Sequence, residues 1–443
     1  MRIQLSDHFT YKRLLRFVMP SIVMMIFTSI YGVVDGLFVS NFVGKTPFAA
    51  INLIMPLLMG LGTIGFMIGT GGSALVSKTL GEGQPKKANQ YFSMLICMTV
   101  ISGIVLTAIG LFAIRPVALA MGATGELLEN CVVYGSIMLT FQTAFMLQNV
   151  FQSLFAVAEK PKLGLMITVA AGMTNILLDA LFIAVFRWGL AGAAIATAVS
   201  QIVGGIIPII YFARHNSSLL SLTKPVFSVK TILKVCTNGS SELMTNLSNS
   251  VIGVLYNLQL MKIAGENGIA AYGVIMYVNF IFNAIFFGYA IGSAPVVGYH
   301  YGAENYSELK NLFRKSLTFI GICGVSLTGL ALLLAAPLSK IFVGYDVALF
   351  EMTAHGFRLF ALSFLIGGFN IFSSAFFTAL NNGFVSATIS FARTFLFQSI
   401  MVVFLPLVLG IDGIWLAIGV AELLALSVTA LFFIKKKKRY QYA

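Results

Sequence analysis

Residues 48–77 read FAAINLIMPLLMGLGTIGFMIGTGGSALVS, a run without a single charged side chain. A helix of about 20 residues crosses the ~30 Å hydrocarbon layer of a bilayer, so this run is long enough to span a membrane. The whole chain has the same character: of its 443 residues, 58% are hydrophobic and 10% are charged, with a mean hydropathy of +0.93. Because soluble domains carry about 25% charged residues, the sequence predicts an integral membrane protein. The same composition excludes a disordered, collagen-like or disulfide-stapled chain.

Apolar runs of similar length recur along the chain and predict an all-α protein with twelve membrane-spanning helices. A membrane β-barrel would need ~10-residue segments of alternating polarity, which the sequence lacks. The first run follows a polar decapeptide and shows no small-residue cleavage site, so we expect a retained span and not a signal peptide. The predicted spans are 14–40, 48–77, 91–114, 132–156, 163–186, 190–212, 238–263, 269–298, 312–335, 356–379, 384–409 and 413–434.

Basic residues are distributed unevenly between the two sides of the predicted membrane. Twenty-one Lys and Arg fall at the termini and in the loops of one side, six fall on the other side, and Arg393 lies within a span. Because loops rich in Lys and Arg stay in the cytoplasm, we expect both termini to be cytoplasmic and the protein to lie in the cytoplasmic (inner) membrane. This asymmetry also accounts for the net charge of +13, so no nucleic-acid partner is expected.

An internal repeat divides the predicted spans into two sets. When the sequence is shifted by 221 residues and aligned with itself, identical residues match at several positions, among them Gly81 with Gly302. We therefore expect two six-helix lobes, 1–213 and 235–443, joined by a basic cytoplasmic linker at 214–234. Because six is an even number, both halves enter the membrane in the same direction, as in the parallel repeats of many alternating-access transporters.

Prolines inside the predicted spans favour bending of the helices that carry them. Static kinks that merely shape the packing are an equally good interpretation of any one of these residues. The prolines concerned are Pro20, Pro56, Pro208, Pro295 and Pro406.

Buried acids in the first half predict a cation site. An acid at the centre of a membrane helix costs about 2.5–3.5 kcal/mol. At ~1.5 Å per residue from the nearest outer-side charge, Asp35 and Asp179 lie about 15 and 12 Å deep, and Asn175 and Thr197 lie at a similar level. Carboxylate, amide and hydroxyl oxygens suit a hard cation, and paired buried carboxylates suit a proton switch. We predict a site for Na⁺ or H⁺ at Asp35, Asn175, Asp179 and Thr197, with a packing network as the alternative.

The second half does not repeat this set of residues. A structural requirement of the scaffold would be expected in both halves, so the difference favours a functional role for the first-half set. The shifted positions hold Tyr256, Leu396, Ile400 and Ile418.

Three further charges lie within predicted spans of the second half. Glu242 lies about 12 Å from the cytoplasmic side, too far to join the cation set; it could be a second coupling acid, a cleft-lining residue or part of a solvated helix entrance. Arg393, about 16 Å from that side, could pair with Glu242 or with loop carbonyls. Glu422 stands where the first half has Gln201 and could form a counterpart site.

The sequence shows no sign of an enzyme. The HExxH, GxSxG, Walker A and GxGxxG motifs do not occur in a plausible context, so neither catalysis nor an ATP-driven pump is supported. The four cysteines form no CxxC pair, so neither a zinc site nor a disulfide framework is expected. No cofactor is expected beyond the coupling ion.

One face of the fourth span is polar, with Gln142, Asn149 and Gln152 at helical spacing. Such a stripe is costly against lipid, so we expect it to face the interior of the bundle or a cleft.

Several stretches together resemble the multidrug and toxic compound extrusion (MATE) family. They are YGVVDGLFVSNFVG at 31–44, LGEGQPKKANQYF at 80–92, NILLD at 175–179 and GLAGAAIATAVSQ at 189–201. The resemblance covers nearly the whole chain. It implies a monomeric, cation-coupled antiporter in membrane lipid that exports amphipathic, often cationic, small molecules.

The resemblance also implies roles for individual residues. In one branch of the family the cation site lies in the first lobe, at the positions that match Asp35, Asn175, Asp179 and Thr197. Polar residues of the fourth helix line the substrate chamber in that branch. Other members use acids in the seventh and tenth helices, where this chain has Glu242 and Asn370. The chamber candidates are Asn149, Gln152, Tyr31 and Met24.

Several alternative functions remain open. A lipid-linked oligosaccharide flippase of the same superfamily would share the fold, but such proteins usually carry two extra helices. A small-metabolite secondary exporter would share the mechanism. A major-facilitator carrier would show a charged signature between spans 2 and 3, which LGEGQPKKANQ lacks. A membrane-embedded enzyme would need a catalytic constellation that the sequence does not contain.

Overall fold

The computed structural model describes residues 3–443, without the side chains at positions 37, 40, 41 and 45, and the described chain is almost entirely helical. The first set of helices comprises α1 (Tyr11–Phe42), α2 (Lys45–Gly81), α3 (Pro85–Ala120), α4 (Gly125–Thr140), α5 (Gln142–Val157), α6 (Pro161–Asp179), the π-helix η1 (Ala180–Val185) and α7 (Gly189–Ala213). The second set comprises α8 (Val229–Gly302), α9 (Tyr306–Val343), α10 (Val347–Ala361), α11 (Phe364–Ala379), α12 (Gly383–Phe391), the π-helix η2 (Ala392–Leu396), α13 (Phe397–Leu409) and α14 (Ile411–Tyr440).

The helices account for twelve membrane crossings. Among the described residues, nine helical segments are long and apolar enough to span a bilayer, and the bent pairs α4–α5 and α10–α11 add one crossing each. The 74-residue α8 is long enough for two crossings, and it breaks at Gly265, whose φ of 61° and ψ of −150° are accessible to glycine alone. The predicted count of twelve spans is confirmed.

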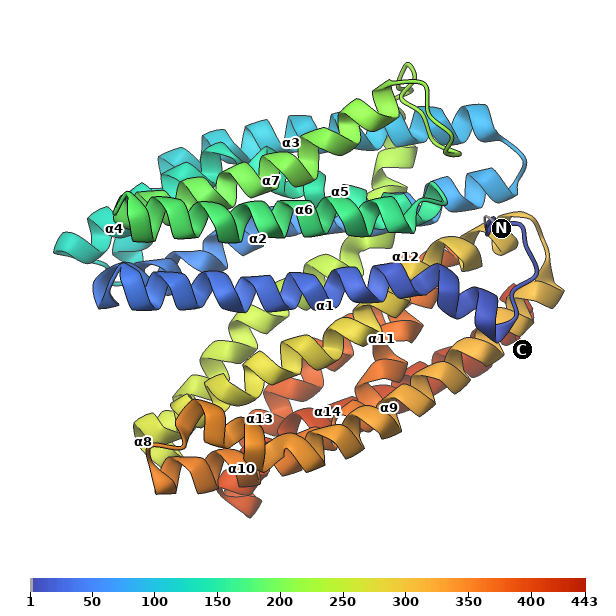
Figure 1. Ribbon diagram of the computed structural model, residues 1–443. Coiled ribbons are helices and arrows are strands. Elements are labelled where there is room, and N and C mark those ends of the chain that lie inside the picture. The colour runs from blue at the N-terminus through green and yellow to red at the C-terminus, as the bar shows by residue number, and fades with distance from the viewer. Residues whose placement is uncertain (1–2) are drawn as a thin grey trace.

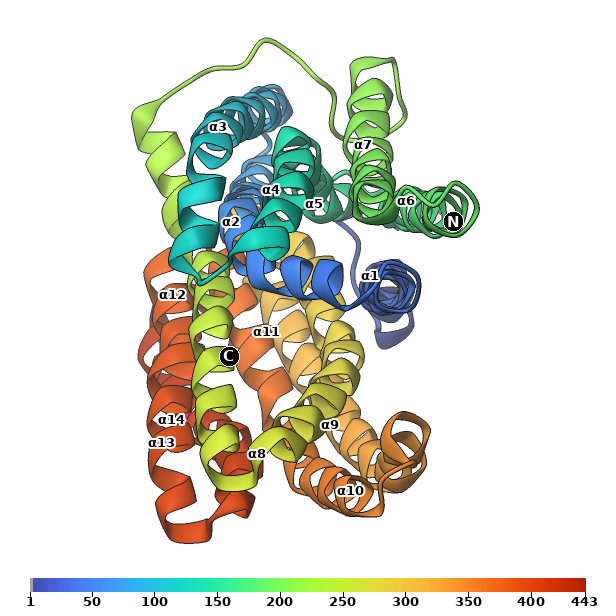
Figure 2. The same ribbon diagram turned by 90° about the vertical axis from the view of Figure 1, so that its left-hand side faces the viewer.

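The helices form two lobes that meet at one end of the molecule. Figure 1 shows α1–α7 on one side and α8–α14 on the other, with both chain termini at the same end. We call this end, where the lobes touch, the closed end. The lobes diverge toward the opposite, open end, which faces the viewer in Figure 2. Contact between the lobes is made mainly by α1 and α2 against α8.

Each lobe is packed around a cluster of aromatic rings at positions related by the 221-residue shift. In the first lobe the ring of Phe92 lies 5.0 Å from that of Phe212, and in the second the ring of Phe313 lies 4.9 Å from that of Phe433. The internal repeat of the sequence is therefore a repeat of packing. The full sets are Phe92, Phe151, Phe155 and Phe212 in the first lobe and Phe313, Phe372, Phe376 and Phe433 in the second.

The two sharpest bends also fall at equivalent positions, and no proline lies at either of them. The fourth span bends by 54° at Phe141, between α4 and α5, and the tenth bends by 50° between α10 and α11, at Leu362 and Ser363. The prolines that the sequence marked as bend sites lie inside continuous helices. Neighbouring groups in a membrane bundle can satisfy the carbonyl that a proline frees, so a helix continues through it.

At the closed end, α2 and α8 pack backbone against backbone. A Cβ on Gly81 would lie 2.9 Å from the backbone nitrogen of Ala303 and would overlap the carbonyl oxygen of Tyr299. A Cβ on Gly302 would in turn overlap the carbonyl oxygen of Lys78. The 221-residue shift relates Gly81 to Gly302 and Lys78 to Tyr299. The two contacts, Gly81 with Tyr299 and Gly302 with Lys78, are therefore equivalent, and the packing of α2 on α8 is pseudo-twofold symmetric.

A non-helical N-terminal segment, residues 3–10, bridges the lobes at the closed end. Leu5 and Phe9 are fully buried. The backbone N–H of Leu5 donates to Glu159 Oε1 of the first lobe at 2.7 Å, and that of Phe9 donates to Glu308 Oε1 of the second lobe at 2.9 Å. The Phe9 carbonyl accepts a further bond from Lys315 Nζ at 2.6 Å. The segment is therefore bonded to both lobes at once.

Candidate ion and cargo sites

The residues of the predicted cation set come together inside the first lobe. Helix α6 packs against both α1 and α7, and it carries Asn175 and Asp179 one turn apart, at 1% and 0% exposure. The Asn175 amide donates to Thr197 Oγ1 of α7 at 3.4 Å. The Asp35 carboxylate of α1 contacts the Asp179 carboxylate and the Asn175 amide. We refer to Asp35, Asn175, Asp179 and Thr197 as the first-lobe cluster.

Three of the four carboxylate oxygens of this cluster lack a hydrogen-bond donor among the described residues. Among the described residues, no donor reaches Oδ1 of Asp35 or either oxygen of Asp179. Buried polar groups are nearly always hydrogen-bonded, and two carboxylates in contact repel each other unless a proton or a cation lies between them. The oxygen ligands of the cluster are of the type that a hard cation prefers. The cluster therefore fits a small monovalent cation or a shared proton.

The backbone changes its helical period at this cluster. Asp179 is the last residue of α6 and is followed directly by the π-helical turn η1. Single π-turns within α-helices are frequent at functional sites because they shift the side chains that follow. This feature, together with the buried ring of Tyr134 close to both carboxylates, is not apparent from the sequence pattern.

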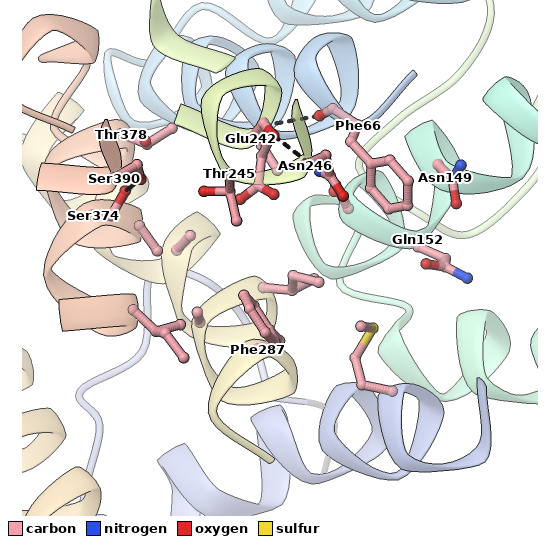
Figure 3. Close-up of a pocket in the computed structure, with 18 of the residues that line it drawn as sticks. Phe66, Asn149, Gln152, Glu242, Thr245, Asn246, Phe287, Ser374, Thr378 and Ser390 are labelled. Atoms are coloured by element: carbon pink, nitrogen blue, oxygen red, sulfur yellow. Dashed lines mark hydrogen bonds between the residues drawn. The ribbon is translucent and has the colours of Figure 1, made fainter. Parts of the chain in front are cut away.

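A cavity of about 250 Å³ lies between the lobes. Figure 3 shows Asn149 and Gln152 of α5 and Phe66 of α2 on its first-lobe side, with Ser374, Thr378 and Ser390 across from them. Its apolar wall is completed by Phe280, Phe287, Ile291 and Ile371. An apolar surface with scattered hydroxyl and amide groups suits an amphipathic small molecule.

Two of the four predicted chamber residues line this cavity and two do not. Asn149 and Gln152 line it, as does Glu242. Met24 is 2% exposed and faces away from the cavity, which is lined instead by Met25, because one residue along a helix rotates the side chain by about 100°. Tyr31 packs against the backbone of Gly172 on α6, outside the cavity.

The second lobe contains a buried ion pair instead of a carboxylate pair. Arg393, in η2, donates from Nε to Glu422 Oε1 of α14 at 2.6 Å. Asn370 donates to Glu422 Oε2 at 2.7 Å and accepts from Thr429 at 2.8 Å. The partner that the sequence suggested for Arg393 was Glu242 or a loop carbonyl; the partner found is Glu422. Arg393 also lines the interlobe cavity.

The ion-binding candidate and the cargo-binding candidate are separate in space but share a helix. The first-lobe cluster does not line the interlobe cavity. Helix α1, however, carries Asp35 of the cluster and also Met25 and Ser29 of the cavity wall. A change in how α1 packs against α6 would therefore alter the cavity. No group of three or more His, Cys, Asp or Glu residues that could hold a metal ion occurs in the described part of the chain.

Comparison with known proteins identifies relatives with the same architecture. The MatE family model matches twice, over residues 20–181 and 242–404. The chain is 24% identical over 367 residues to the multidrug export protein MepA of Staphylococcus saprophyticus, covering 81% of this chain and 80% of that protein. It is 23% identical over 379 residues to MepA of Staphylococcus aureus, covering 84% and 82%.

Solved structures share the fold over nearly the whole chain. An outward-facing multidrug resistance MATE transporter of the MOP superfamily superimposes with a TM-score of 0.92 at 22% identity, covering 98% of both chains. A MOP superfamily transporter from Pyrococcus furiosus superimposes with a TM-score of 0.90 at 21% identity, again over 98% of both chains.

Proposed function

Because the chain belongs to the MatE family, we propose that it is a cation-coupled antiporter that exports amphipathic small molecules across the cytoplasmic membrane by alternating access. The relatives named multidrug export proteins support the cargo class. The basic residues of the closed end support a cytoplasmic location for both termini. In that orientation the cavity between the lobes opens to the outside.

The observation that carries the coupling proposal is the buried contact between the carboxylates of Asp35 and Asp179, in which three of the four oxygens have no hydrogen-bond donor among the described residues. Two buried negative charges in contact are unfavourable, and binding of Na⁺ or H⁺ removes that repulsion. The ion that enters from outside therefore stabilises close packing of α1 against α6. The pair lies away from the cavity, so ion and cargo need not occupy one place.

Helix α1 supplies the physical link between ion and cargo. When the ion binds Asp35 and Asp179, a shift of α1 moves Met25 and Ser29 in the cavity wall and weakens the hold on cargo in the outward-open state. Release of cargo then favours return to the inward-open state. An ion drives this cycle only if it binds the two states with different affinity, and the contact between α1 and α6 is where that difference arises.

The test is transport by the purified protein in liposomes, with a fluorescent amphipathic cation such as ethidium as cargo. An inward Na⁺ gradient at equal pH and a pH gradient without Na⁺ are imposed in separate runs. We expect one gradient to drive efflux and Asp35→Asn to abolish that dependence while ethidium binding persists. The matched control is Glu126→Gln, which changes an exposed carboxylate of the same lobe. Undiminished ion-driven efflux by Asp35→Asn would remove the cluster from the mechanism.

A further inference from the structure

Arg393 is a charged residue in the middle of a membrane span, and its side chain is fixed by an ion pair with Glu422. An arginine at this depth is costly unless it is paired. Its Nε donates to Glu422 Oε1 at 2.6 Å, and Glu422 is only 3% exposed at its side chain. Asn370 bonds both the other carboxylate oxygen and the backbone carbonyl of Glu422. This arrangement fixes the direction in which the guanidinium points.

The rest of that guanidinium is available to a ligand. Within the described residues, Arg393 makes no hydrogen bond through its two terminal nitrogens. Neither nitrogen is among the buried atoms that lack a partner, so both are accessible. The residue lines the interlobe cavity. A guanidinium bound at one nitrogen still offers a fork of N–H donors, which matches the two oxygens of a carboxylate.

A carboxylate of the protein lines the same cavity without pairing with Arg393. Glu242 makes no ion pair within 4.0 Å and no side-chain hydrogen bond among the described residues. The carboxyl group of Glu242 is therefore available to a cationic group, while Arg393, whose charge acts on Glu242 through space, is available to an anionic one. The wall of the same cavity also carries the rings of Phe66, Phe280 and Phe287.

We propose that Arg393 is a specificity-determining residue of the cargo site, and that the cavity selects amphipathic zwitterions over cations of the same shape. This inference rests on the proposed export function, since it names the cargo class of that site. The carboxylate of the cargo binds the terminal nitrogens of Arg393, and its cationic centre lies toward Glu242. Glu422 acts as a positioning residue that holds the guanidinium toward the cavity.

The test is binding to the purified protein, measured by fluorescence anisotropy with two matched dyes. Rhodamine B carries the xanthene cation and a free carboxylate, whereas its ethyl ester carries the cation alone. We expect the wild-type protein to bind rhodamine B more tightly than the ester. Arg393→Gln should lower the preference for rhodamine B about tenfold, the effect of losing one charged hydrogen-bonding pair. Partitioning of the dyes into detergent is the same for every variant, so it cancels when the ratio between the dyes is compared from one variant to the next.

Two further variants separate recognition from folding. Arg393→Gln leaves Glu422 buried without its cation, so the double variant Arg393→Gln/Glu422→Gln removes both charges together and should lose the preference equally. Glu242→Gln should weaken both dyes by the same factor, because both carry the cation, and should leave the ratio unchanged. Arg393→Lys should restore part of the preference.

Equal binding of the two dyes by the wild-type protein, including no binding of either, would overturn the inference. So would an unchanged ratio in both variants that lack Arg393. Failure of the export proposal has a different signature, namely no ion-driven efflux of ethidium by a protein that still binds the dyes with the expected ratio.

Discussion

The backbone contact between Gly81 and Gly302 predicts that one methyl group will open the closed end. Substitution of either glycine by alanine places a Cβ into the backbone of the other lobe. The matched control is Gly273→Ala in the same helix α8, where a Cβ meets nothing within 4 Å. Both substitutions in α8 gain about 1 kcal/mol of helix propensity, so the difference between them isolates the contact.

The structure sets the size of the effect. A Cβ on Gly302 would lie 2.9 Å from the carbonyl carbon of Lys78, whereas carbon atoms pack at about 3.5–4.0 Å. Helices α2 and α8 must therefore separate by about 1 Å at this point, and overpacking of this kind costs about 1–3 kcal/mol. Separation of the lobes relieves the overlap, so the cost appears as a population shift. A cost of about 1.4 kcal/mol corresponds to a tenfold rise in the fraction of molecules whose lobes are separated at the closed end.

The assay is the distance between spin labels on the two lobes. Lys86 at the start of α3 and Lys310 at the start of α9 are exposed and are replaced by cysteine in a background without native cysteines. Double electron–electron resonance then measures the fraction with a long distance. We expect that fraction to rise about tenfold in Gly302→Ala and Gly81→Ala relative to Gly273→Ala. Identical distance distributions and melting temperatures in Gly302→Ala and Gly273→Ala would refute the role assigned to the contact.

Two further substitutions test the polar contacts of the second lobe. Glu308→Ala removes the acceptor of the Phe9 backbone N–H and should release residues 3–10. The release is measured as faster hydrogen exchange of that peptide, with Glu351→Ala at an exposed position as the control. Equal exchange in the two variants would contradict the role of Glu308. Asn370→Ala leaves buried groups of Glu422 and Thr429 without partners and should lower the free energy of unfolding by about 1–3 kcal/mol. The measurement is thermal unfolding in detergent, with Thr388→Ala, at a half-exposed position of α12, as the control. A melting temperature equal to that of the control would show that the network does not contribute to stability.

Hydrophobic run length predicted most of the fold because the thickness of the membrane sets the length of a spanning helix. The twelve crossings follow from segment length. The closed-end contact between Gly81 and Gly302 and the bonding of residues 3–10 to both lobes could not be predicted, since they depend on how the lobes are oriented. The bends also escaped prediction: they fall at Phe141 and near Leu362, and neither position carries a residue that breaks helices.

Depth alone predicted which polar residues share a level, but not the direction in which they point. It grouped Asp35 with Asp179 because their distances from flanking charges agree. It gave Glu242 and Arg393 comparable heights and so suggested a pair, whereas Arg393 is hydrogen-bonded to Glu422 on α14. The resemblance implied Met24 as a chamber residue, whereas Met25 lines the cavity, since one position along a helix changes the face by about 100°.

The paired aromatic clusters of the two lobes bear on how such a chain arose. Each six-helix unit holds four phenylalanines at matching places, as expected if both units derive from one that already had this packed centre. The ionisable residues do not match between the lobes. The first lobe has two acids where the second has Tyr256 and Ile400, and the position equivalent to Arg393 in the first lobe is Gly172. The two lobes thus share the packing of their centres but differ in the ionisable residues that they carry.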